Sequence, residues 1–339
     1  MENPSHARVP NLHVYSGWKG HHGIARFGRE VITRLTLPFS SVDSTHSPTS
    51  PLDVVGPYRF RLRRSDLLYT PGFNAGICRA PQVLTIHDLI HLHVEDESSL
   101  TKRAYYELVV KPAVKKAGLV LTVSTASKED IQTWLNCDDV RVINVGNGAS
   151  AEFGSDEEQH NFEVTADRFI FVGNLKPHKN LKVILQALRL RPHFSLDVVG
   201  SDANAVQSLA RQFDVENQVV THTSIDDSML ADMYRASAAL LFPSILEGFG
   251  LPAVEAMRCG TPVVYWTGCT TVAEIAAESG FGVDSSADAD AWANAMDECS
   301  KSAESGKITP SEAWNRQYDW ERVASNVSNA LRAYSSIST

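Results

Sequence analysis

Short apolar runs alternate with longer stretches of helical periodicity along most of the chain. The runs at 12–15, 119–123 and 239–242, for example, are rich in Leu, Val and Ala and carry few polar residues. Such runs are typical of strands that are buried on both faces of a parallel sheet. The stretches between them repeat apolar residues every three or four positions, as amphipathic helices do. The alternation predicts an α/β protein whose parallel sheets are covered by helices on both faces.

The first half of the chain is expected to hold several such strand and helix units. The predicted strands are 12–15, 53–55, 67–69, 83–86, 119–123 and 140–145. The predicted helices are 24–35, 99–117 and 128–135. Residues 36–52 are rich in Ser, Thr and Pro, and we expect them to form a surface loop.

The second half of the chain repeats the alternation. It begins with FIFVGNLKPHKNLKVILQAL, a pattern that predicts a strand, a loop and an amphipathic helix. Further strands are predicted at 194–200, 218–222, 239–242, 261–265 and 281–283, and further helices at 229–236, at 272–278 and from Asp319 onward.

The length of the chain favours two domains over one. It has 339 residues, whereas a single hydrophobic core stops growing at roughly 250–300 residues. Residues 150–166 are polar and acidic, as linkers often are. We therefore expect an N-terminal domain over residues 1–163 and a C-terminal domain over residues 164–318.

Charge and cysteine content exclude several classes of protein. The formal net charge is -9, so no nucleic-acid partner is expected, because nucleic-acid binders rely on basic residues that neutralise phosphates. The five cysteines are an odd number without close paired spacing, which indicates neither a disulfide framework nor a zinc site. A reduced, cytoplasmic location is therefore expected.

Membrane insertion is not expected from the sequence. The N-terminus, MENPSHARVP, lacks the apolar region of a signal peptide. No uninterrupted apolar run approaches the roughly 18 residues of a membrane span. Any contact with a membrane is therefore expected to be peripheral, at its inner face.

The stretch SILEGFGLPAVEAMRCGTPVV, residues 244–264, carries the densest candidate chemistry. It follows a predicted strand and opens a helix with Pro252 in its first turn and Gly260 just past its end. In an open α/β sheet, ligands bind where strands end and helices begin, and a helix start favours an anion. Glu247 in the loop and Glu255 one turn into the helix would bracket such a ligand.

This stretch resembles the Glu-x7-Glu signature of retaining GT-B glycosyltransferases of the family-four, or glycosyl transferases group 1, type. The resemblance implies two doubly wound, Rossmann-like domains that face each other across a cleft, with a C-terminal helix over 319–339 that packs back on the first domain. It implies that Glu255 binds the ribose of a nucleoside-diphosphate sugar and that Glu247 faces the transferred sugar. Without the resemblance, the stretch would be an ordinary strand, loop and helix with two surface glutamates.

The loop after the strand at 169–172 is similar to the diphosphate loop of the same family. Lys179 matches the lysine of its basic pair, whereas His178 stands in place of the usual arginine. Gly173 and Asn174 lie in the same loop, and the resemblance places both at the donor. The backbone N–H groups of Phe249, Gly250 and Leu251 are expected to share the diphosphate charge with Lys179.

Two segments of the first half add candidates for the site. The string IHDL puts His87 just past a strand end and resembles a segment of mannosyltransferase-like members, in which the histidine lies near the donor sugar. A structural histidine is the alternative. The glycine-rich loop that ends at Gly23 resembles, more loosely, the N-domain loop that approaches the donor diphosphate and the acceptor. Its spacing is not that of the dinucleotide-binding fingerprint.

The segment RFRLRR is the most basic part of the first half. If it is extended, Arg59, Arg61 and Arg63 lie on one face. A charge-guarded sheet edge is the favoured interpretation, and a patch for an anionic acceptor or a lipid surface is the alternative.

The resemblance implies a retaining glycosyltransferase that moves a hexose, with mannose favoured, from a nucleoside-diphosphate sugar to a hydroxyl of a glycan or lipid-linked glycan in surface polysaccharide assembly. GDP-mannose is the favoured donor, and no further cofactor and no catalytic metal are expected. The triplet Asp288-Ala289-Asp290 is the only acidic triplet that resembles a metal motif, and we expect it to cap the following helix instead. A sugar-nucleotide epimerase of the same fold and a non-catalytic sugar-nucleotide-binding protein remain alternatives.

Overall fold

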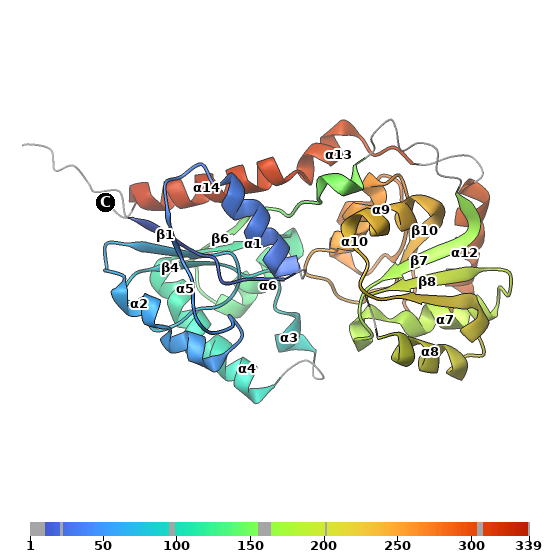
Figure 1. Cartoon of the computed structure of the whole chain (residues 1–339), viewed down its shortest axis with the longest axis horizontal. Helices are drawn as coiled ribbons and strands as arrows, with labels where there is room; N and C mark the ends of the chain where they lie inside the picture. Colours follow the sequence, from blue (N-terminus) through green and yellow to red (C-terminus); the bar gives the residue numbers. More distant parts are fainter. Residues whose placement is uncertain are drawn as a thin grey trace, which may run out of the picture. The chain divides into compact units, whose positions relative to one another are not determined.

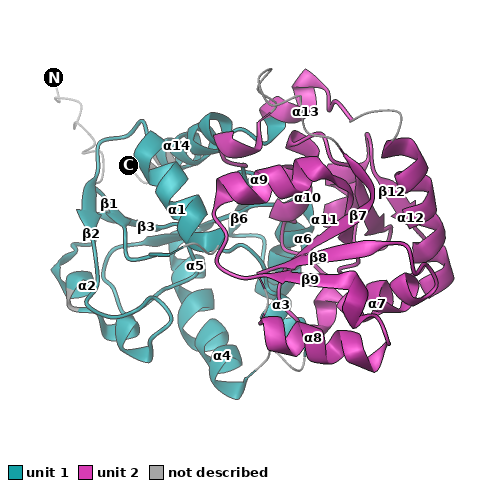
Figure 2. Ribbon diagram, turned by 45° about the vertical axis from the view of Figure 1, so that its right-hand side comes forward, with its two compact units in different colours: residues 1–148, 317–339 teal, residues 149–316 magenta. Residues whose placement is uncertain are grey.

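The chain forms two compact α/β units (Figures 1 and 2). The computed structural model describes residues 11–20, 23–94, 99–154, 164–200, 202–303 and 308–337. Unit 1 consists of residues 1–148 and 317–339, and unit 2 of residues 149–316. Each unit has its own parallel sheet of six strands.

The sheet of unit 1 has the strand order β2-β1-β3-β4-β5-β6. Its strands are β1 (Leu12–Tyr15), β2 (Ser40–Val42), β3 (Leu67–Thr70), β4 (Gln82–Thr85), β5 (Leu119–Thr122) and β6 (Arg141–Asn144). The helices are α1 (Gly23–Arg34), α2 (Pro57–Arg61), α3 (Ile90–His93), α4 (Leu100–Tyr105), α5 (Lys111–Ala117), α6 (Thr125–Leu135) and α14 (Trp320–Ile337). A 3-10 helix, η1 (Pro51–Val55), precedes α2, and a π-helical turn, η3 (Tyr106–Val110), joins α4 to α5.

The structure differs from three sequence expectations for unit 1 around residues 40–61. The predicted strand at 53–55 is the 3-10 helix η1, because Ser50 caps it by accepting from the Leu52 N–H and Pro51 begins its first turn. A short edge strand, β2, lies instead within the predicted loop and pairs with β1. The arginine-rich segment is not extended either, since α2 turns Arg59 into the interior, where it is fully buried against Asp53.

The C-terminal helix α14 is part of unit 1 and lies beside α1 (Figure 1). Its buried face carries Val323, Val327 and Leu331 at helical spacing. Polar contacts fix its position: Arg34 of α1 donates to Glu321 across 3.0 Å, and Asn326 donates to the carbonyl that precedes Gly146.

The sheet of unit 2 has the strand order β12-β11-β10-β7-β8-β9. Its strands are β7 (Thr165–Val172), β8 (Ser195–Val199), β9 (Val219–His222), β10 (Ser237–Phe242), β11 (Val263–Trp266) and β12 (Phe281–Val283). Its helices are α7 (Leu181–Arg189), α8 (Ala203–Gln212), α9 (Asp227–Ala236), α10 (Leu251–Arg258), α11 (Thr270–Ala276), α12 (Ala289–Ala303) and α13 (Glu312–Gln317). Short 3-10 helices are η4 (Ala151–Phe153), η6 (Pro177–Lys179) and η7 (Glu216–Gln218).

Apolar packing explains the layers of unit 2. Phe169 and Phe171 of β7 pack into one buried cluster with Leu185 of α7 and Trp292 of α12. Helices α9 and α10 lie on the opposite face of the sheet (Figure 1). The expected cap at the start of α12 is confirmed, because Oδ1 of Asp288 accepts from the N–H groups of Asp290 and Ala291.

The units divide after Gly148, whereas the sequence places the domain boundary after residue 163. Residues 155–163 lie outside the described part of the chain. The segment before them packs within unit 2, because the ring of Phe153 contacts that of Tyr234 and the Arg235 guanidinium donates to the carbonyls of Glu152 and Gly154. These contacts draw the segment into the second unit.

Candidate functional site

The strand order of unit 2 reverses between β7 and β10, which are parallel neighbours. In doubly wound sheets, such a switch point opens a crevice at the carboxyl ends of the strands, and ligands bind there. The loops that leave β7 and β10 both start at this edge. They are tied together, because the Ile245 N–H donates to the His178 carbonyl across 2.7 Å and the Asn180 side chain donates to the Pro243 carbonyl across 3.4 Å.

Lys179 and Glu247 meet at this switch point, one from each loop. The Lys179 ammonium donates to Oε1 of Glu247 across 2.6 Å. Their side chains are only 15% and 10% exposed, respectively. The ammonium also lies 5.7 Å from the ring centroid of Phe242, the last residue of β10. A shielded cation at a strand end is suited to bind an anion, because less of its charge is screened by water.

The start of α10 adds backbone donors at the same edge. Gly250 precedes the helix with φ of 100°, a left-handed conformation that favours glycine. Gly250 has no side chain to accept from the first N–H groups, and Pro252 has no N–H of its own. A helix start of this kind favours an anion through its oriented N–H groups and its dipole. Leu251 is the first residue of the helix, directly after the loop that carries Phe249.

Glu255 lies one turn into α10 and is 4% exposed. The hydroxyl of Tyr234, a buried residue of α9, donates to its Oε2 across 3.4 Å. The loop that carries Glu247 is held in place separately, because the Thr271 hydroxyl of α11 donates to the Glu247 carbonyl across 3.1 Å. Both glutamates belong to the segment that follows β10, but α9 holds the side chain of Glu255 and α11 holds the backbone of Glu247.

Gly173 and Asn174 begin the loop after β7. A side chain on Gly173 would lie 3.8 Å from Cδ of Lys179, so the lysine stem passes beside this glycine. Oδ1 of Asn174 accepts from the Lys176 N–H across 3.2 Å, which shapes the turn. His178, which stands where an arginine was expected, is 8% exposed.

His87 and Gly23 belong to unit 1. Nε2 of His87 lies 3.1 Å from the Pro71 carbonyl, a geometry in which this nitrogen carries the proton and donates. The imidazole also packs edge-on against the ring of Phe27, with centroids 4.9 Å apart. Gly23 is the exposed first residue of α1.

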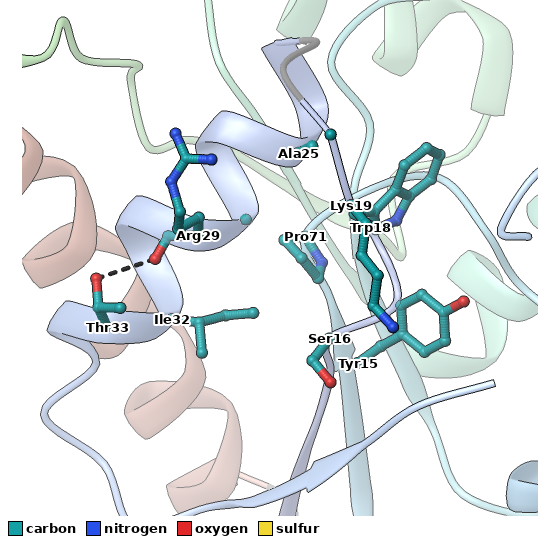
Figure 3. Close-up of a pocket in the computed structure, with 11 residues that line it drawn as sticks. Tyr15, Ser16, Trp18, Lys19, Ala25, Arg29, Ile32, Thr33 and Pro71 are labelled. Carbon is teal, nitrogen blue, oxygen red and sulfur yellow. Dashed lines mark hydrogen bonds between the residues drawn. The ribbon is translucent and has the colours of Figure 1, made fainter.

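A cavity of about 370 Å³ lies at the switch point of unit 1, where the strand order reverses between β1 and β3 (Figure 3). Arg29 and Ile32 of α1 form one wall, and Tyr15, Trp18 and Lys19 form the other. The Trp18 indole is fixed by donating to the Asn74 side chain across 2.9 Å. The Lys19 ammonium pairs with Asp43 across 2.9 Å.

The sequence did not indicate several residues that support these sites. The Tyr234 hydroxyl donates to Glu255, and the Thr271 hydroxyl donates to the carbonyl of Glu247. The ring of Phe242 lies beside the ammonium of Lys179. All three supporting residues lie in ordinary buried or helical patterns, which carry no sign of a site. In unit 1, Trp18 and Lys19 lie in the first glycine-rich loop and line the cavity. An aromatic and a basic residue in such a loop could have indicated a binding site there.

Residues 153–312 match the family model described as glycosyl transferases group 1. The O-antigen chain mannosyltransferase RfbU of Salmonella typhimurium is 28% identical over 188 residues, which cover 54% of this chain and 51% of that protein. The O-antigen chain mannosyltransferase B of Escherichia coli is 25% identical over 267 residues, which cover 74% of this chain and 70% of that protein. The match thus spans about half the length of the Salmonella relative.

Solved structures resemble nearly the whole chain. A sucrose-phosphate synthase from Thermosynechococcus elongatus has a TM-score of 0.65 at 18% identity, covering 97% of each chain. A glycosyltransferase from Rickettsia africae has a TM-score of 0.67 at 14% identity, covering 96% of this chain and 99% of its own. At these identities the likeness shows the fold, and it confirms the expected GT-B architecture of two parallel α/β domains.

Within the described ranges, no helix has the length and apolarity needed to cross a membrane. Over the same residues, no three His, Cys, Asp or Glu side chains are grouped so that they could hold a metal ion.

Proposed function

We propose that the chain is a retaining hexosyltransferase of the glycosyl transferases group 1 type, whose family model matches residues 153–312. It moves a hexose, with mannose favoured, from a nucleoside-diphosphate sugar to a hydroxyl of a glycan or lipid-linked glycan in surface polysaccharide assembly. The observation that carries this proposal is the pair formed by Lys179 and Glu247 across the switch point of unit 2.

The reaction breaks the bond between the anomeric carbon and the diphosphate, so negative charge grows on the leaving phosphate. Lys179 and the N–H groups at the start of α10 are placed on fixed elements to offset that charge, which is where preorganised donors help most. Glu247 orients the sugar and offsets its developing positive charge. The acceptor hydroxyl attacks on the same face and passes its proton to the leaving phosphate oxygen, which retains the configuration.

Glu255 is assigned to the ribose of the donor. A carboxylate can accept two hydrogen bonds from a vicinal diol. Its burial and its hydrogen bond from Tyr234 hold it in one place. GDP-mannose is the favoured donor because of the segment from His87 to Leu89 and because two relatives are named mannosyltransferases.

The acceptor is assigned to unit 1, at its own switch point. The cavity beside Trp18 and Tyr15 offers aromatic faces, and Lys19 and Arg29 offer donors for hydroxyl groups. An acceptor with several hydroxyls fits such a lining of apolar faces and a few polar groups.

Nucleotide sugars test the proposal directly. Thermal unfolding is measured with GDP-mannose, other GDP and UDP sugars, and matched nucleoside monophosphates. A ligand at about 100 times its dissociation constant adds roughly 2.7 kcal/mol of stability. We expect a diphosphate sugar to stabilise the wild type and to stabilise Lys179→Ala much less, and turnover of the hit is then measured with glycan acceptors.

Two results would contradict the proposal. If no diphosphate nucleotide raises the unfolding temperature, the donor assignment to unit 2 is wrong. If a donor is converted to an isomer without any acceptor, the protein is an epimerase of the same fold.

A further inference from the structure

Large apolar side chains are exposed together in unit 1, on η1, α2 and the loop after β3. Leu52 and Val55 of η1 are 56% and 47% exposed, respectively, and Phe60 and Ile77 are each 60% exposed. Exposed single apolar residues are normal, but a group of them marks an interaction surface.

Contacts between η1, α2 and the loop after β3 bring together the segments that carry these four exposed side chains, which we call the Phe60 face. The Ile77 N–H donates to the Val54 carbonyl across 2.8 Å, so the loop lies directly on η1. A side chain on Gly76 would come within 2.4 Å of that same carbonyl, and only glycine allows this close approach. The Cys78 thiol contacts the Arg59 carbonyl of α2 across 3.4 Å.

Within residues 51–80, which carry the Phe60 face, the exposed charges are all positive. Between residues 51 and 80 the only acidic residues are Asp53 and Asp66, which are 1% and 6% exposed. The exposed charged residues of this range are Arg61, Arg63, Arg64 and Arg79. Lys116 of α5 extends the basic rim, because its ammonium donates to the carbonyls of Cys78 and Arg79 across 2.9 and 2.8 Å.

This purely basic rim contrasts with the net charge of the whole chain, which is -9. Unrelated surface charge would mix both signs. An apolar group inside a basic rim matches the interface of an anionic lipid bilayer, where apolar side chains enter below the headgroups and arginines bind lipid phosphates. The same rim disfavours a symmetric pair of chains, because an isologous contact would set arginine against arginine.

We propose that the Phe60 face docks unit 1 on an anionic lipid bilayer. Leu52, Val55, Phe60 and Ile77 insert at the level of the headgroups, and Arg61, Arg63, Arg64 and Arg79 bind phosphates around them. Docking is a property of unit 1 and does not depend on the proposed transferase activity. A lipid-linked acceptor would be presented at the surface to which the enzyme is bound.

Vesicle sedimentation tests the proposal. The full chain is mixed with phosphatidylcholine vesicles and with vesicles of phosphatidylcholine and phosphatidylglycerol. We expect binding to the anionic vesicles alone, weakened at high salt because the arginine contacts are screened. Replacing Arg61, Arg63 and Arg64 together by Gln is expected to weaken binding about a hundredfold, at about fivefold for each arginine near the surface. Phe60→Ser with Ile77→Ser is expected to weaken it at least about tenfold.

Matched variants in unit 2 and on α14 serve as controls. Arg211, Lys301 and Arg322 are exposed basic residues, and Val220 and Met229 are exposed apolar residues outside the Phe60 face. Replacing the three basic residues by Gln, or the two apolar residues by Ser, is expected to leave vesicle binding within about twofold.

The proposal is overturned if the wild type does not sediment with anionic vesicles at low salt. It is overturned as well if the control variants lose as much binding as the Phe60-face variants. A third result would assign the face to a second copy of the chain. In that case the protein forms concentration-dependent dimers, does not bind vesicles, and loses the dimers when Phe60→Ser and Ile77→Ser are introduced. Donor-induced thermal stabilisation of each variant shows that its fold is intact and reports on the transferase proposal separately.

Discussion

The ammonium of Lys179 donates to Oε1 of Glu247 across 2.6 Å, although the two residues lie 68 positions apart in the chain. Each was expected at the donor for a separate reason, the lysine for the diphosphate and the glutamate for the sugar. If Lys179 binds the diphosphate as proposed, the carboxylate competes with the diphosphate for the same cation. The pair is shielded from solvent, so this competition is stronger than between surface charges.

Removing the charge of Glu247 is expected to separate binding from turnover. In Glu247→Gln, nucleoside diphosphate affinity is retained or tightened, because Lys179 loses its competing carboxylate. Turnover falls by about 10²–10³-fold, the usual effect of removing one electrostatic contact to a transition state. Calorimetry and initial rates measure the two quantities. A tenfold loss of nucleoside diphosphate affinity would mean that Glu247 faces the nucleotide and that the orientation of the motif is reversed.

Glu255 is expected to act mainly on affinity. In its proposed role, Glu255 binds a ribose far from the reacting bond, so we expect Glu255→Ala to weaken donor and free nucleoside diphosphate binding alike. A hydrogen bond with a charged partner is worth roughly 1.5–3 kcal/mol, which corresponds to about tenfold to a hundredfold weaker binding. Tyr234→Phe is the matched control, since it keeps the carboxylate and removes the hydroxyl that donates to it across 3.4 Å. Equal losses in the two variants would assign Glu255 a structural role.

Turnover is expected to survive a chelator. Lys179 and the start of α10 are fixed in the fold, and we expect the ammonium and the backbone N–H groups to offset the diphosphate charge in place of a metal ion. Initial rates with and without EDTA measure this directly. Loss of activity in EDTA, with recovery on adding Mn²⁺ or Mg²⁺, would show that the reaction depends on a metal.

The buried pair of Arg59 and Asp53 is expected to contribute to stability, in contrast to the exposed arginines next to it. Both side chains are buried, and the guanidinium donates to Oδ2 of Asp53 across 2.9 Å. Arg59→Ala leaves the buried carboxylate of Asp53 without its cation, with the Asn74 amide still donating to it across 3.0 Å, and loss of a buried charge partner costs about 3–5 kcal/mol. Arg61→Ala is the control and changes stability by less than about 0.5 kcal/mol. Urea unfolding compares the two variants, and similar values would indicate that Arg59 is not buried.

The buried thiol of Cys269 is expected to make the free energy of unfolding fall at alkaline pH. Burial, reinforced by the nearby charge of Glu247, raises the pKa of its thiol from 9.0 to about 11. The unfolded chain therefore releases this proton first, and the stability that the neutral thiol contributes is present below pH 9 and lost as the pH rises to 11. The loss is about 1.4 kcal/mol for each pH unit in this window. Urea unfolding of wild type and Cys269→Ala from pH 8 to 11 should show their difference shrinking, and a constant difference would contradict the prediction.

Local patterns in the sequence predicted most elements of both units. Strands such as Leu67–Thr70 and Phe281–Val283 are apolar runs between turn residues, and α10 is marked by Pro252 and Gly260. The Asp288 cap was predictable because its partners lie two and three residues away. The strand predicted at 53–55 failed because an apolar run that short is also compatible with a 3-10 turn capped by Ser50.

The sequence alone determined that two parallel sheets form, that Lys179 and Glu247 lie in loops that follow strands, and that Glu255 lies one turn into a helix. Only the tertiary structure decided that β7 and β10 are neighbours at a switch point, which brings Lys179 to Glu247. It also decided that Arg59 turns inward to Asp53 while Phe60 stays exposed. Periodicity reports on which face of its own element a residue lies, because it depends on backbone geometry over a few residues. Contacts across tens of residues depend on strand order and packing, which no local pattern contains.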